Sequence, residues 1–314
     1  MAARDVVLLF PGQGSQKAGM GAALAEAHPA ARRVFETADD VLGLPLSRLC
    51  FDGPDEELTR TENAQPALLA HGAAAWAAIG DAAGPHVRAA AGHSLGEFTA
   101  YHVAGALALA DALRIVRRRG ELMADSGAVR PGAMAAVLGL DEDAVERTCR
   151  DAGDAGIVVP ANYNAPDQLV VSGEVAAVER VMVLAKEAGA KRAIRLNVSG
   201  AFHSPLMATA ADGLRQALDA VVFGPPAFPV YANVSAEAVR DPAVARRLLV
   251  EQLASPVRWT AIVLALASAF PNALFVELGP GSVLGNLVKR IAPGTETAAC
   301  GTAADVDTLL ARLS

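Results

Sequence analysis

Apolar residues in this chain form short unbroken runs that alternate with longer segments of helical periodicity. Val6 to Phe10 is apolar at every position and is followed by Pro11-Gly12, which is typical of a strand buried on both faces of a parallel sheet. A shorter run, Ala89 to Ala91, also indicates a buried strand. Helices are predicted at 30–42, 66–80, 96–104 and 110–126, the second with proline in its first turn.

From Ala133 the spacing changes. It predicts strand, helix, strand, strand, helix and strand at 133–138, 141–152, 157–162, 168–172, 174–188 and 191–196, which is the βαββαβ order of a ferredoxin-like unit. Beyond this block the α/β pattern resumes, with helices at 205–218, 241–253, 257–269 and 283–291 and strands at 228–231 and 273–277.

The predicted fold class is therefore α/β: a large α/β-hydrolase-like domain with a parallel sheet core, and a small ferredoxin-like domain inserted into it. We place the large domain at residues 1–128 and 198–314 and the small domain at residues 129–197. A chain of 314 residues is long enough for this arrangement.

A serine between two glycines, in Gly92-His93-Ser94-Leu95-Gly96, lies between the second apolar run and a predicted helix. This context is that of a nucleophile elbow, a sharp strand-to-helix turn that exposes the serine hydroxyl. A glycine-rich turn without chemistry is the alternative, because such a string also arises by chance. A base and an oxyanion site elsewhere in the chain would favour the nucleophile.

His203 is the best candidate base among the six histidines. It lies in a loop of small residues that returns from the predicted insert to the large domain. An α/β-hydrolase would also need an Asp or Glu at a strand end between serine and histidine, and no acidic residue fits. We predict a Ser94–His203 dyad whose imidazole is oriented by a neutral acceptor such as a backbone carbonyl.

A tetrahedral oxyanion needs two backbone N–H donors. The Leu95 amide, next to the nucleophile, supplies one. The glycine-rich loop from Pro11 to Gln16 leaves the first strand, and we expect it to bring the Gln13 amide close to the elbow. A plain turn is the alternative; a P-loop is disfavoured because its lysine and spacing are absent.

Arg117-Arg118-Arg119-Gly120 places three arginines in a row on a predicted helix, so only one of them can point inward. Three solvated arginines are the alternative. An inward Arg119 beside an acyl-serine would offer a planar, bidentate partner to a carboxylate. Such a site would select acyl groups with a free acid end.

The composition disfavours some classes of binding partner. With 27 basic and 34 acidic residues, a net charge of -7 and 4% aromatic residues, nucleic acid and anionic membrane surfaces are disfavoured. The longest apolar stretch, Ala261 to Phe270, is shorter than the ~18 residues of a membrane span. Three widely spaced cysteines suit a reduced protein. We expect a soluble, cytoplasmic monomer.

These motifs resemble those of the malonyl-CoA:acyl-carrier-protein transacylases, the acyltransferases of type II fatty acid synthesis and of polyketide synthases. The resemblance covers essentially the whole chain, and the family's large α/β domain with a ferredoxin-like insert matches the predicted layout. Besides the motifs above, it rests on Thr61 to Ala67, Asn162 to Gly173, Gly200 to Met207, Gln252 to Trp259 and Glu277 to Gly281.

The resemblance implies that Ser94 is acylated, that His203 is base and then acid, and that Arg119 pairs with the malonyl carboxylate. It also implies that the Gln13 and Leu95 amides form the oxyanion hole. Malonyl would pass from malonyl-CoA through Ser94 to the phosphopantetheine thiol of an acyl carrier protein, by a ping-pong mechanism. No metal and no redox cofactor would be needed.

Three more residues match substrate-binding positions of the family. Gln252 matches a position near the catalytic histidine, and its backbone carbonyl is a candidate orienter. Asn162 matches a position that lines the cleft from the small domain. Phe202 and Leu95 resemble the malonyl-type rather than the methylmalonyl-type pattern, and a bulky Phe202 would disfavour an extra methyl group by about 1 to 3 kcal/mol.

Two other functions stay open. An acyl-thioester hydrolase on the same fold would differ only in whether water reaches the acyl-serine, and a carrier-protein-binding module would lack catalysis. The motifs do not separate fatty acid from polyketide synthesis. Acidic carrier proteins would dock on a basic patch, for which the candidates are Lys191, Arg192 and Arg195, or Lys289 and Arg290.

Overall fold

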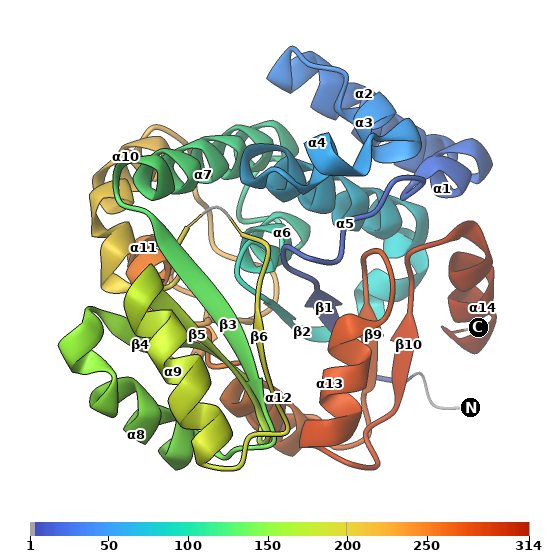
Figure 1. Cartoon of the computed structure of the whole chain (residues 1–314). Coiled ribbons are helices and arrows are strands. Elements are labelled where there is room, and N and C mark those ends of the chain that lie inside the picture. The colour runs from blue at the N-terminus through green and yellow to red at the C-terminus, as the bar shows by residue number, and fades with distance from the viewer. Residues whose placement is uncertain (1–3, 199, 314) are drawn as a thin grey trace.

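The computed structural model describes residues 4–198 and 200–313, so residues 1 and 314, the outer limits of the predicted large domain, lie outside the described residues. Two sheets organise the chain (Figure 1). The larger has the strand order β10-β9-β1-β2-β7-β8. Its strands are β1 Val6–Phe10, β2 Val87–Gly92, β7 Val230–Tyr231, β8 Ala238–Val239, β9 Leu274–Glu277 and β10 Thr297–Ala299.

Helices surround this sheet and also cover the smaller one (Figure 1). The α-helices are α1 Ala22–Ala27, α2 Pro29–Leu42, α3 Leu46–Asp52, α4 Asp55–Thr59, α5 Thr61–Ala83, α6 Gly96–Val103, α7 Leu109–Val129, α8 Glu142–Asp151, α9 Val175–Glu187, α10 Ala208–Asp219, α11 Pro242–Glu251, α12 Trp259–Ala269, α13 Val283–Ile291 and α14 Ala303–Leu313. The short 3₁₀ helices are η1 Gly84–His86, η2 Gly153–Ala155, η3 Pro205–Met207 and η4 Gln252–Ala254.

Strand β1 lies at the centre of the parallel part of the large sheet, between β9 and β2. Its side chains alternate between two apolar cores. Val6, Leu8 and Phe10 pack in the core that includes α5, α6 and α7, whereas Val7 and Leu9 pack in the core that includes α12 and α13. A strand covered on both faces is apolar at every position, and this confirms the predicted parallel sheet.

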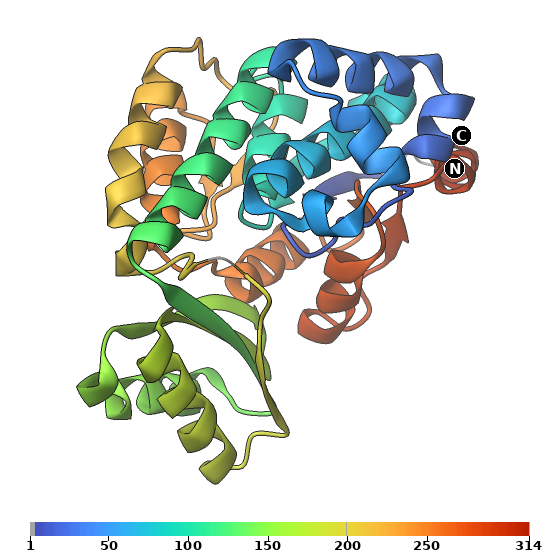
Figure 2. The same ribbon diagram turned by 45° about the horizontal axis from the view of Figure 1, so that its top comes forward.

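The second sheet is smaller and antiparallel, in the order β4-β5-β3-β6. Its strands are β3 Gly132–Leu138, β4 Val158–Ala165, β5 Gln168–Glu174 and β6 Arg192–Arg195. Together with α8 and α9 it encloses its own apolar core and projects from the body of the molecule (Figure 2). This is the ferredoxin-like unit that the βαββαβ pattern predicts. All its strands fall within 129–197, and the domain limits themselves stay a prediction.

Helix α5 begins at Thr61, so the prediction that it begins at Pro66 is wrong. Proline has no N–H, and the Glu62 carbonyl, four residues earlier, therefore lacks its helical donor. The Arg117 guanidinium on α7 donates to that carbonyl at 3.1 Å, which allows the helix to include the proline. The predictions also miss α1, α3, α4, β8, β10 and α14.

No helix of the described residues is both long and apolar enough to cross a membrane.

Candidate active site

Ser94 lies in the tight turn between β2 and α6 and has φ 52°, a conformation that is rare for residues other than glycine. Asn233, which follows β7, holds this turn from both sides. Its Oδ1 accepts a hydrogen bond from the Ser94 N–H at 2.7 Å, and its Nδ2 donates to the Gly92 carbonyl at 2.7 Å. The turn therefore keeps the Ser94 side chain at the end of the parallel sheet.

The two glycines of the motif are needed because backbone passes too close for a side chain. A Cβ on Gly92 would lie 1.9 Å from the Gly96 carbonyl carbon, and a Cβ on Gly96 would lie 2.1 Å from the Phe10 oxygen. Neither distance is compatible with a methyl group. The elbow thus packs directly on the end of β1, from which the Gln13 loop leaves.

His203 is 4% exposed, and its Nε2 lies 2.8 Å from Ser94 Oγ. Its Nδ1 lies 2.8 Å from the Gln252 carbonyl oxygen and 3.2 Å from the Ser255 carbonyl oxygen. Because a carbonyl oxygen only accepts, Nδ1 carries the hydrogen and Nε2 is left to accept the Ser94 proton. Burial, and then the Arg119 charge, lower the pKa of His203 to about 3. The imidazole is therefore neutral at physiological pH.

Arg119 points inward from α7 and is 1% exposed. Nη1 donates to Gln65 Oε1 at 2.7 Å, and Nη2 donates to Gln252 Oε1 at 2.9 Å and to Ser94 Oγ at 3.0 Å. Burial lowers the pKa of Arg119 to about 10, while the nearby Glu97 carboxyl acts to raise it. The guanidinium thus stays charged at neutral pH, next to the serine hydroxyl.

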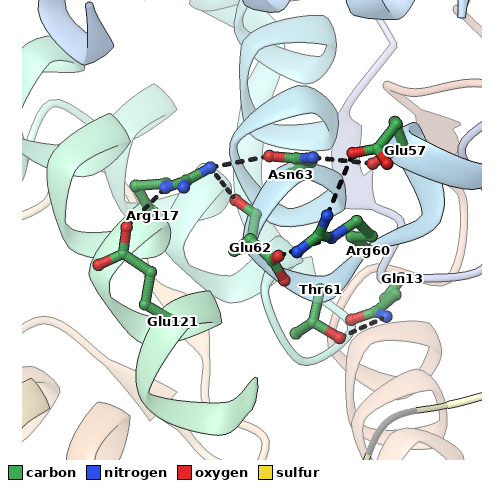
Figure 3. A network of polar contacts seen from close by, with 8 residues as sticks. All are labelled: Gln13, Glu57, Arg60, Thr61, Glu62, Asn63, Arg117 and Glu121. Carbon is green, nitrogen blue, oxygen red and sulfur yellow. Dashed lines mark hydrogen bonds and ion pairs between the residues drawn. The ribbon is translucent and has the colours of Figure 1, made fainter. Parts of the chain in front are cut away.

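Arg117, two residues before Arg119, does not line the cavity over Ser94 and instead binds the start of α5 (Figure 3). It donates to the Glu62 carbonyl and, at 2.8 Å, to Asn63 Oδ1. In the same region Gln13 Nε2 donates to Thr61 Oγ1 at 3.2 Å. The start of α5 therefore binds both the helix that carries Arg119 and the loop that carries Gln13.

A cavity of about 310 Å³ lies over Ser94. Of the eight residues predicted for the site, seven line it: Gln13, Ser94, Leu95, Arg119, Asn162, Phe202 and His203. Met123, Met134, Leu196 and Val198 add apolar wall, which comes partly from the small sheet. Gln252 does not line this cavity. It is fully buried and contacts two residues that do line it, Arg119 and His203.

Glu97 and Asn233 belong to the site, and the sequence predictions miss both. Glu97 is 1% exposed, and its Oε2 accepts from the Asn233 N–H at 3.0 Å and from Gln252 Nε2 at 2.7 Å. Burial raises its pKa to about 7. An acid in the first turn of a helix ordinarily indicates a helix-dipole interaction, and no local signal marks Asn233.

His93, next to Ser94 in the chain, makes no hydrogen bond to Ser94 Oγ or to His203 among the described residues. Its Nε2 lies 2.8 Å from Asn164 Oδ1, and its ring packs 5.6 Å from that of Trp259. It braces the elbow against β4 and α12. Within residues 4–198 and 200–313, no group of three or more His, Cys, Asp or Glu side chains is placed to hold a metal ion.

Comparison with known proteins identifies the family of this chain. The family model of the acyl transferase domain matches residues 7–305. The malonyl CoA-acyl carrier protein transacylase of Bacillus subtilis (strain 168) is 46% identical over 287 residues, which are 91% of this chain and 90% of that protein.

Solved structures are similar over nearly the whole chain. The acyl-carrier-protein-S-malonyltransferase from Bartonella henselae has a TM-score of 0.95 and 41% identity, covering 98% of this chain and 99% of that one. A malonyl-transacylase in complex with its type II PKS acyl-carrier protein has a TM-score of 0.94, 41% identity and the same coverage. This chain therefore belongs to the acyl transferase family, among the malonyl CoA-acyl carrier protein transacylases.

Proposed function

We propose that this chain transfers malonyl from malonyl-CoA to the phosphopantetheine thiol of an acyl carrier protein, with Ser94 as nucleophile. Family membership supports the reaction, and one neighbour was solved with a type II PKS acyl-carrier protein. One observation carries the assignment of residues: Ser94 Oγ lies 2.8 Å from His203 Nε2 and 3.0 Å from Arg119 Nη2. A candidate base for the hydroxyl and a cation that could bind a carboxylate thus both contact the Ser94 Oγ atom.

In the first half-reaction His203 Nε2 takes the Ser94 proton while Oγ attacks the thioester carbonyl carbon. The Gln13 and Leu95 amides donate to the oxyanion. The intermediate then breaks its C–S bond, and the CoA sulfur leaves with the proton that His203 returns. In the second half-reaction the carrier thiol gives its proton to His203, its sulfur attacks the malonyl ester, and Ser94 regains its proton.

Arg119 would pair with the free carboxylate of the malonyl group, since a guanidinium offers two parallel donors to a carboxylate. Phe202 would crowd a substituent on the acyl α-carbon, and Asn162 would line the cleft from β4. The Gln252 carbonyl would keep the hydrogen of His203 on Nδ1. Exchange of a thioester for an ester and back changes no oxidation state, so we propose that no redox cofactor takes part and that no metal is needed.

We also propose that the chain acts as a monomer in the cytoplasm. Cys50, Cys149 and Cys300 are free and buried, and burial raises the pKa of each thiol to about 12. Unpaired thiols are typical of a reducing compartment.

Intact mass after exposure to malonyl-CoA tests the proposed function. The wild-type chain should gain one malonyl group and lose it when a phosphopantetheinylated carrier protein is added, with malonyl recovered on the carrier. Ser94→Ala should gain none. Ser204→Ala removes a hydroxyl one residue from the proposed base, and it should still be loaded.

Two outcomes would favour the other functions. CoA release that continues at the same rate without carrier protein would identify an acyl-thioester hydrolase, and a wild-type chain that never gains the malonyl mass would identify a binding module.

A further inference from the structure

Glu97 is a buried carboxyl group that the mechanism above does not use. It lies in the first turn of α6, on the side of Arg119 and Gln252 away from the cavity lining. Its Oε2 accepts two hydrogen bonds, from the Asn233 N–H at 3.0 Å and from Gln252 Nε2 at 2.7 Å. Its Oε1 has no hydrogen-bond partner among the described residues. Such a group is rarely buried without a role.

The contact with Glu97 decides which way the Gln252 amide points. Arg119 carries only donors, so it needs the oxygen end of the amide, which lies 2.9 Å from Nη2. A flipped amide would turn its NH₂ group against the guanidinium and its oxygen against the Glu97 oxygen. The Glu97 oxygen, which accepts the Nε2 end, therefore keeps the Oε1 end on Arg119.

Two other acceptors near Gln252 Nε2 are further away and already in use. The Ser94 carbonyl lies at 3.1 Å and also accepts from the Glu97 N–H, and Asn233 Oδ1 lies at 3.4 Å and accepts from the Ser94 N–H at 2.7 Å. Glu97 supplies the shortest of the three contacts. Without the Glu97 carboxylate, Gln252 Nε2 would keep only the two longer contacts, to acceptors that already receive another hydrogen bond.

We propose that Glu97 is a positioning residue: by fixing the Gln252 amide, it holds the Arg119 guanidinium in place for the acyl carboxylate. This inference rests on the proposed function. Burial raises the pKa of Glu97 to about 7, and a proton on the unpartnered Oε1 would leave Oε2 as an acceptor. The positioning therefore works in both protonation states.

The test compares Ser94 acylation by malonyl-CoA and by acetyl-CoA, measured as single-turnover rates by intact mass. Glu97→Met keeps the length of the side chain but removes the acceptor. We expect it to lower the ratio of malonyl to acetyl rates about tenfold, the usual order for one lost hydrogen bond to a charged network. Glu97→Gln can place its carbonyl oxygen where Oε2 lies, and it should keep the ratio within about twofold.

Glu277 provides the matched control. It is also 1% exposed, and its Oε2 accepts from the Gly285 N–H at 2.8 Å, away from the cavity. Glu277→Met should reduce both rates equally, through the folded fraction alone. Where Glu97→Met does not fold, Glu97→Asp, which withdraws the acceptor by one methylene, should lower the ratio about threefold.

A wild-type ratio in Glu97→Met, or in Glu97→Asp if that variant is the one that folds, would overturn the proposal. An equal loss for both acyl groups would also overturn it, because a purely structural role does not distinguish the substrates. A wild-type chain that acquires no malonyl group would instead refute the proposed function, before Glu97 is in question.

Discussion

At the residue scale, the two side chains proposed to react both lie on unusual backbone. Ser94 has φ 52° and His203 has φ 56°, a region that disfavours L-residues by about 1–3 kcal/mol. Asn233 accepts from the backbone N–H of Ser94, and the Gln252 and Ser255 carbonyls contact the His203 ring at Nδ1. These contacts hold the Ser94 turn and the His203 ring where Oγ and Nε2 meet.

The pH dependence of acylation follows from His203. As the proposed base it could take a proton only when neutral, and burial together with the Arg119 charge lowers its pKa from 6.5 to about 3. As the pH falls through 6.5 the imidazole remains neutral, so kcat/KM for malonyl-CoA should stay constant well below that pH. A pH profile of single-turnover acylation checks this. An acid limb centred at pH 6.5 or above would contradict it.

Arg119→Ala should slow the acylation of Ser94 by malonyl-CoA, raising its transition-state free energy by about 2–5 kcal/mol. This is the usual cost of removing one partner of a buried charge pair. Acetyl loading should fall far less, because acetyl has no carboxylate. Rates with both CoA thioesters measure the difference. Arg118→Ala, an exposed neighbour on the same helix, is the control and should change neither rate. Equal losses in Arg119→Ala would make the arginine structural.

At the scale of elements, the α5–α7 pair places Arg119. Helices α5 and α7 approach so closely that a Cβ on Gly120 would lie 2.7 Å from Glu62 Cα and 2.8 Å from the Thr61 carbonyl oxygen. Successive residues of a helix point about 100° apart, so Arg117 can bind the start of α5 while Arg119 enters the site. The glycine after Arg119 is what permits this contact.

Gly120→Ala should therefore destabilise the fold by about 1–3 kcal/mol, the usual effect of overpacking. It should also lower the malonyl-to-acetyl ratio, because α7 must move away from α5. Urea unfolding and the two acylation rates check the prediction. Gly224→Ala, where a Cβ meets nothing within 4 Å, should leave both unchanged. Normal stability in Gly120→Ala would show that the helices are not in tight contact.

At the scale of the whole molecule, the small sheet lines part of the cavity and packs on the large domain through apolar residues and several specific polar contacts. Ala161 and Tyr163 of β4 exchange backbone hydrogen bonds with Val257, each at 2.9 Å. Arg290 of α13 binds Asp167 and Gln168, at the turn between β4 and β5. The cleft between the two parts is thus set by contacts distant in sequence.

Ion pairs within the chain refine the predicted carrier-docking patch. Arg290 pairs with Asp167, and Arg195 pairs with Glu179 at 2.8 Å, so part of the positive charge of both candidate patches is compensated within the chain. Lys289→Glu should raise the KM for the carrier protein, because carrier proteins are typically acidic, and leave CoA release unchanged. Arg33→Glu, on α2 at the other end of the molecule (Figure 1), is the control. Unchanged carrier kinetics in Lys289→Glu would exclude that patch.

Motifs with strong local chemistry were predictable. The Gly92–Gly96 elbow, the buried β1 and the ferredoxin-like unit follow from spacing and turn residues, and the structure agrees with them. The start of α5 was not predictable, because a side chain from α7 satisfies the carbonyl that Pro66 leaves free. Glu97 and Asn233 were missed for the same reason: their roles depend on partners far along the chain.

Local order along the chain was thus enough to single out Ser94, His203 and Arg119 as candidates, because residue type and helix or strand period are properties of near neighbours. Only the tertiary structure decided which of these residues contact one another. His203 lies 109 positions from Ser94, and Gln252 lies 155 from Glu97. Hydrogen bonds act over about 3 Å, so only the path of the chain through both sheets determines which of these groups meet.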